Sequence, residues 1–145
     1  MLEDVTEPLR PNLPPGWPTG VLPPGTDGWE ETAIRWLWRL VPADYQQHQL
    51  LRDEPRVLAR LARQTVESQL SAMRSGYRTM RADMADLLEP RRIEDAMQLY
   101  AWEGSRLREL AQQVHLVEEA LVRGVRWRPA PRPEAGGSRR HGGMG

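Results

Sequence analysis

Few residues of this chain have the types and spacing that acid–base or metal chemistry requires. His115 has carboxylates at helical neighbour spacing, because Glu118 and Glu119 follow it by three and four residues. One edge of a metal site is conceivable there, yet a carboxylate-bridged metal bundle needs Glu-x-x-His on two helices. Position 112 is Gln, and the chain has no second copy of the motif. We therefore expect no metal and no cofactor at His115, and a surface or helix-cap role instead.

Four acids form a second cluster, and paired carboxylates can act as general acids and bases. They are Asp83, Asp86, Glu94 and Asp95. Because Arg91 and Arg92 lie among them, we expect these carboxylates to solvate a loop and to offset those two arginines. The chain also lacks the phosphate-binding pattern G-x-x-x-x-G-K-[ST]. The sequence predicts a protein that is not an enzyme and has no catalytic residues.

Aromatic and arginine residues are better candidates for a binding function. Tryptophan and tyrosine supply contact area, and arginine with an interleaved aromatic ring can hold phosphates and stack on bases. The candidate interaction residues are Trp17, Trp36, Trp38, Tyr77, Tyr100, Arg126, Trp127 and Arg128. They support two alternative functions. One is a small-molecule sensor with a pocket between Trp36, Tyr77 and Tyr100, and the other is a nucleic-acid-associated protein that uses the basic C-terminal tail.

The composition favours neither nucleic acid nor a membrane as the partner. All 20 basic residues are arginine and they balance 20 acids, so the formal net charge is zero. A neutral domain without a recognition fold is not typical of nucleic-acid binding. No stretch is apolar enough for a spanning helix, and residues 1–5 lack the basic and apolar regions of a signal peptide. The absence of cysteine excludes disulfides but does not indicate the redox compartment. Because the sequence shows neither a signal peptide nor a spanning helix, we expect a cytoplasmic protein.

Two runs of apolar residues at heptad spacing decide the expected fold. Apolar residues recur in steps of four and three through 66–87 and again through 93–114, on either side of Pro90. This pattern predicts an antiparallel helical hairpin with a coiled-coil seam, with helices over about 54–88 and 91–123.

The position of Pro90 sets the register that we expect in this hairpin. If the chain folds back at Pro90, Met80 contacts Tyr100 and Leu87 lies beside Ile93. The same register brings the two mid-helix glycines and several charged residues face to face. The expected pairs are Gly76 with Gly104, Arg60 and Arg63 with Glu118 and Glu119, and Arg78 with Glu103. Close packing of the helices explains the glycines best, and a notch for a ligand is the alternative.

The N-terminal part is expected to dock on the hairpin. Residues 1–25 are rich in Pro and Gly, which favours a polyproline II arm, with Trp17 as the anchor on the folded body. A Trp-rich helix over about 28–41 follows, with Asp27 as its N-cap. Because this helix is apolar around much of its circumference, we expect it to be largely buried.

The stretch Val21–Asp44, with its Pro-Pro-Gly and its Trp-rich helix, resembles uncharacterised small helical proteins of GC-rich actinobacteria. The resemblance spans about residues 15–123 and implies no activity.

These observations predict an all-α protein with a Pro/Gly-rich arm over 1–25, a helical domain over 26–128 and a disordered basic tail over 129–145. The docked helix, about 21 Å long, cannot cover a hairpin of about 50 Å. Apolar residues at the end remote from Pro90 therefore need a cover from the first helix, from the short turn that follows it or from another subunit. These residues are Val57, Leu58, Leu61, Leu110, Val117 and Leu121. We expect a non-enzymatic protein–protein interaction or scaffold protein, as a homodimer or with a protein partner.

Overall fold

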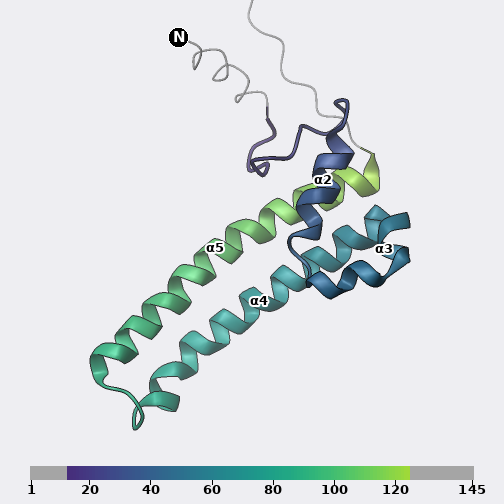
Figure 1. The fold of residues 1–145 in the computed structure, drawn as a ribbon. Coiled ribbons are helices and arrows are strands. Elements are labelled where there is room, and N and C mark those ends of the chain that lie inside the picture. The colour runs from purple at the N-terminus through teal and green to yellow at the C-terminus, as the bar shows by residue number, and fades with distance from the viewer. Residues whose placement is uncertain (1–12, 125–145) are drawn as a thin grey trace, which may run out of the picture.

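The computed structural model describes residues 13–124, which form an all-α fold around a long antiparallel hairpin. The helical segments are α2 (Trp29–Trp38), the 3-10 helix η2 (Ala43–Gln47), α3 (Gln49–Asp53), α4 (Pro55–Met84) and α5 (Pro90–Arg123). In Figure 1, α4 and α5 run side by side, and α2 and α3 lie at the end of the hairpin remote from its turn. The predicted fold class, an all-α helical hairpin, is confirmed.

The ends of the two long helices follow from proline and glycine. Each helix begins with a proline, Pro55 or Pro90, at a position where the missing N–H costs nothing. Gly124 ends α5 with φ +65°, and its N–H donates to the Ala120 carbonyl. Helix α4 ends at Met84, four residues before the predicted bound, and residues 85–89 form the turn.

Helix α2 is shorter than predicted at both ends. It begins after Gly28, whose φ of +79° suits a residue without Cβ, so the predicted N-cap at Asp27 is wrong. It ends at Trp38, because the N–H groups of Arg39 and Leu40 turn back to carbonyls three residues earlier. The buried face of α2 includes Trp29, Ala33, Trp36 and Leu37.

The described part of the arm, residues 13–25, lies on the body and is anchored as predicted by Trp17. Its indole is only 8% exposed and its Nε1 donates to the Val21 carbonyl at 2.9 Å. The Trp17 and Trp29 rings lie 6.2 Å apart, and the Leu22 N–H donates to the Thr32 hydroxyl at 3.0 Å. The arm is a series of turns rather than a polyproline II helix, since its glycines have positive φ.

The core lies at the end of the hairpin that α2, α3 and the arm cover. Leu58 and Val117, two of the apolar residues that we expected to need a cover, are fully buried there. Leu61, Leu110 and Leu121 pack against the same cluster, which leaves Val57 37% exposed. The chain therefore covers this end by itself, through the first helix and the short helical segments after it, which are two of the three predicted covers.

The register of the hairpin differs from the predicted one by about one helical turn. The structure places the Tyr100 ring, not Gly104, against Gly76, and Gly104 faces Met73 instead. Leu87 was expected in the seam beside Ile93 but lies in the turn, 72% exposed. The register is shifted because the turn lies at residues 85–89 and Pro90 is the first residue of α5, whereas the prediction placed Pro90 at the centre of the turn.

The projecting part of the hairpin, residues 71–106, extends away from the other elements (Figure 1). Only Ile93 and Met97 are buried within it, both in the seam between the helices. The other residues of this part are half-buried or exposed. Across residues 13–124, no helix has the length and apolarity needed to span a membrane.

Candidate interaction surfaces on the helical hairpin

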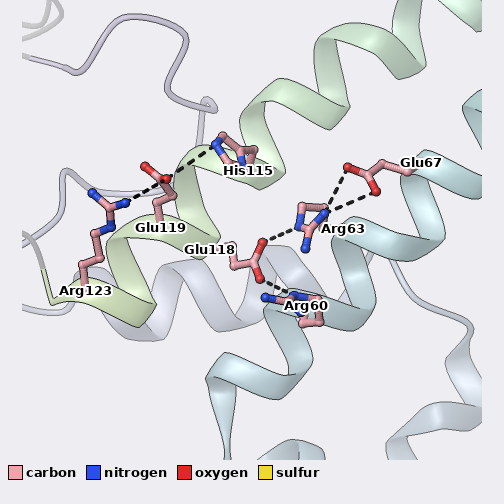
Figure 2. A network of polar contacts seen from close by, with 7 residues as sticks. All are labelled: Arg60, Arg63, Glu67, His115, Glu118, Glu119 and Arg123. Atoms are coloured by element: carbon pink, nitrogen blue, oxygen red, sulfur yellow. Dashed lines mark hydrogen bonds and ion pairs between the residues drawn. The ribbon is translucent and has the colours of Figure 1, made fainter.

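The buried charged group of residues 13–124 is a carboxylate held between the two long helices. Glu118 of α5 is 6% exposed, and both of its oxygens accept hydrogen bonds from arginines of α4. Arg60 Nε donates at 2.7 Å and Arg63 Nε donates to the other oxygen, while Arg63 also contacts Glu67 at 3.2 Å. Figure 2 shows Arg63 between the two acids. This network ties α4 to α5 near the covered end.

The electrostatics of this network keep Glu118 charged. Burial alone would raise its pKa, but the hydrogen bonds from Arg60 and Arg63 outweigh burial and hold the Glu118 pKa below its usual value. The Glu118 carboxylate in turn raises the pKa of Arg63. A carboxylate whose two oxygens are both occupied by fixed cations is a poor general base. The arrangement is that of a structural ion pair.

The neighbouring acid behaves differently from the prediction. Arg60 and Arg63 contact Glu118 as expected, but Glu119 lies along its own helix, 3.6 Å from His115 and 3.6 Å from Arg123. Within residues 13–124, no group of three His, Cys, Asp or Glu side chains could hold a metal ion.

Two of the four acids near the turn, Glu94 and Asp95, are also paired with arginines. Arg81 bonds Glu94 across the hairpin, and Asp95 lies 3.6 Å from Arg92. The predicted pairing of Arg78 with Glu103 is wrong, because Glu103 pairs with Arg106 of its own helix at 2.8 Å.

The candidate aromatic residues separate into buried and exposed ones. Trp17 and Trp36 are core residues, and Trp38 is half-buried against the core. Tyr77 is 47% exposed, and the half-buried Tyr100 packs on Gly76. Arg126, Trp127 and Arg128 lie outside the described residues, so the nucleic-acid function of the tail stays a prediction.

Tyr77 and Tyr100 line a surface hollow of about 380 Å³ between α4 and α5. Trp36 was expected to complete this pocket but lies on the buried face of α2 and does not line it, so the predicted pocket is wrong in that residue. Three arginines complete the lining instead, Arg74 and Arg78 from α4 and Arg108 from α5, with Gly104 and Ser105. We call this place the arginine hollow.

A second surface, which sequence reasoning missed, lies on the outer side of α5. Leu99 is 59% exposed and Trp102 is 67% exposed, one helical turn apart. Charged residues continue the same stripe on both sides at steps of three and four. We call the whole set the α5 strip, and it consists of Arg92, Asp95, Leu99, Trp102, Arg106 and Glu109. The signal was available in the sequence, because these positions repeat at the heptad spacing on the face opposite to the seam.

Comparison with known proteins returned no matching family model, no matching curated protein and no matching solved structure. The resemblance to small actinobacterial helical proteins stays a prediction, and a functional proposal has to come from the two surfaces.

Proposed function

We propose that this protein is a non-enzymatic interaction protein that forms a homodimer through the α5 strip. The observation that carries the proposal is the exposure of Leu99 and Trp102 at the middle of the strip. Tryptophan and arginine are the residues most often found at the energetic centre of protein interfaces. The carboxylates that meet arginines between α4 and α5, those of Glu118 and Glu94, are engaged in ion pairs rather than aimed at a reacting centre.

A second copy of this chain is the partner that the strip fits, because the strip is complementary to itself. If two α5 helices pack antiparallel, with Leu99 of each against Trp102 of the other, the flanking positions also match. Arg92 then lies opposite Glu109 and Asp95 lies opposite Arg106. Opposite charges meet at both ends of the apolar centre, whereas a parallel arrangement would place each charge against its own kind.

The expected dimer is weak and reversible. Burying Leu99 and Trp102 contributes roughly 1.5–3 kcal/mol per side chain, and exposed ion pairs add at most about 1 kcal/mol each. The contact of one helix pair falls below the roughly 1,200 Å² that stable interfaces bury. A dissociation constant on the order of tens of micromolar, about −6 kcal/mol, is consistent with these terms after the cost of association.

Sedimentation equilibrium of the full chain over a hundredfold concentration range tests this proposal. We expect the weight-average mass to rise from 16.6 kDa towards twice that value as the concentration increases. Trp102→Ser should remove the concentration dependence, since it deletes the apolar centre of the strip. Val122→Ser, which changes another exposed apolar residue of α5 away from the strip, is the matched control and should dimerise like the parent chain.

Charge reversal separates the strip from non-specific association. Asp95→Arg alone should weaken the dimer by placing arginine against Arg106 of the second copy. The double variant Asp95→Arg/Arg106→Asp should restore it, because both pairs are then opposite in charge again. A monomer mass at all concentrations, or equal dimerisation of the Trp102→Ser variant, would refute the proposed dimer.

A further inference from the structure

The arginine hollow has features that dimerisation through the α5 strip does not use. It lies between α4 and α5 where the projecting part of the hairpin begins, whereas the strip occupies the outer side of α5. Its three arginines come from two helices and converge on one concave place, which has no acidic residue in its lining.

The charge of the hollow is left unbalanced within the described chain. In residues 13–124, no acidic side chain comes within ion-pair distance of Arg74, Arg78 or Arg108. Most other arginines of α4 and α5 contact a glutamate or an aspartate, including Arg63, which contacts two. Three guanidinium groups that share one hollow repel one another, and an anion bound among them would remove this repulsion.

The two mid-helix glycines give the hollow its shape. A Cβ atom on Gly76 would come within 2.3 Å of the Tyr100 ring, so the missing side chain lets that ring settle against α4. A Cβ atom on Gly104 would meet only Met73, at 4.0 Å, so the missing side chain at Gly104 leaves open space. One glycine therefore positions Tyr100, and the other keeps the hollow open.

We propose that the arginine hollow binds a soluble organic phosphate of about nucleotide size, with its phosphate group among Arg74, Arg78 and Arg108. Guanidinium groups match phosphate oxygens with paired N–H donors, and a phosphate ester carries more charge than a single carboxylate. The volume of about 380 Å³ is in the range of ligand pockets and exceeds what one ion needs. The exposed ring of Tyr77 and the apolar side chain of Met73 are available to the remainder of the ligand.

Titration of the ¹⁵N-labelled full chain with adenosine diphosphate, pyrophosphate and adenosine tests the site directly. We expect the first two to shift the amide resonances of Ala101, Gly104 and Ser105, and we expect adenosine alone to leave them unchanged. Affinity should fall as salt increases, since the contact is between charges. Absence of these shifts at millimolar ligand, or equal shifts with adenosine, would overturn the proposal.

Two variants with a matched control show whether the hollow, rather than the total charge, binds the phosphate. Arg74→Gln/Arg108→Gln should weaken diphosphate binding at least tenfold, and Gly104→Leu should weaken it similarly by filling the space without changing charge. Arg35→Gln/Arg39→Gln removes the same charge from two exposed residues, one in α2 and one just after it, and should bind like the parent chain. Equal weakening by the control, or full binding by Gly104→Leu, would contradict a site in the hollow.

A lipid phosphate headgroup offers the same chemistry as a soluble organic phosphate. Co-sedimentation with vesicles that contain phosphatidic acid distinguishes a lipid ligand from a soluble one. We expect little binding to vesicles, and binding that adenosine diphosphate cannot displace would overturn the assignment of a soluble ligand.

Discussion

Glu118 stands out at the scale of single residues, because it is the buried charged side chain of residues 13–124. A buried carboxylate is stable only if fixed donors replace the water that it loses. Arg60 and Arg63, which lie three residues apart on α4, supply these donors, one to each oxygen of the Glu118 carboxylate. The sequence predicted that both arginines face this part of α5, since charged residues recur there at cross-helix positions. It could not tell Glu118 from Glu119, because adjacent helical positions differ by only about 100° in direction.

Glu118→Gln should lower the free energy of unfolding at neutral pH by about 1–2 kcal/mol, since two charge-assisted hydrogen bonds become neutral ones. Arg60 is half-exposed, and solvent screening keeps the loss below that of a fully buried pair. Urea unfolding at pH 7 measures the difference. Glu119→Gln, which changes an exposed neighbour, is the control and should cost less than about 0.5 kcal/mol.

The same pair of variants should reveal the pH dependence of the network. The folded-state pKa of Glu118 is lowered, so its stabilisation is present above the unfolded value of about 4.3 and is lost as pH falls through the folded value. The difference in stability between the parent chain and Glu118→Gln should therefore shrink in acid below about pH 4. A difference that stays constant from neutral pH to about pH 3 would contradict this linkage.

The contact between α4 and α5 explains, at the scale of elements, why the hairpin was predictable and its register was not. A seam of apolar residues at heptad spacing is satisfied equally well after one helix slides by a turn. The length of the connection decides between such registers, and here residues 85–89 form it while Pro90 opens α5. Proline is compatible with a turn and with the first helical position, so the pattern around Pro90 alone does not distinguish them. The cap of α2 shows the same ambiguity between Asp27 and Gly28.

The two mid-helix glycines should respond oppositely to alanine. Gly104→Ala should stabilise the chain by up to about 1 kcal/mol, since alanine favours the helix and the new Cβ lies 4.0 Å from Met73. Gly76→Ala should destabilise it, because the new Cβ displaces the Tyr100 ring from a place 2.3 Å away. Thermal unfolding of both variants compares their stabilities.

The double variant Gly76→Ala/Tyr100→Ala controls for the clash and should show a smaller cost for the added Cβ than Gly76→Ala does in the parent chain. Equal stabilisation by Gly76→Ala and Gly104→Ala would mean that Tyr100 does not pack on α4 as the structure has it.

The whole molecule divides into a covered end with the core and a projecting part with the two open surfaces. Sequence reasoning identified the apolar residues at the end remote from Pro90, but it could not show that α2, α3 and the arm bury Leu58 and Val117 completely without a second subunit. The sequence-based prediction of the pocket included Tyr77 and Tyr100 correctly, but it named Trp36 as the third residue and omitted the three arginines. The sequence does not show which side chains of a separate helix contact the hairpin. The α5 strip follows from periodicity, yet a stripe with only two apolar members does not stand out from the sequence as an apolar seam.

The orientation of the proposed dimer can be tested by cross-linking, because the chain contains no cysteine. In the antiparallel arrangement, a mixture of the single variants Arg92→Cys and Glu109→Cys should form a mixed disulfide dimer, since these positions face each other. Neither variant alone should form one efficiently, because a residue and its own copy are then separated by roughly 25 Å along the helix axis. A parallel arrangement reverses both outcomes, giving efficient dimers of each variant alone and little mixed product. Adding Trp102→Ser to both variants is the control, since it should abolish cross-linking if the disulfide depends on the strip. Mixed dimers that persist with Trp102→Ser would show that collision rather than the strip brings the helices together.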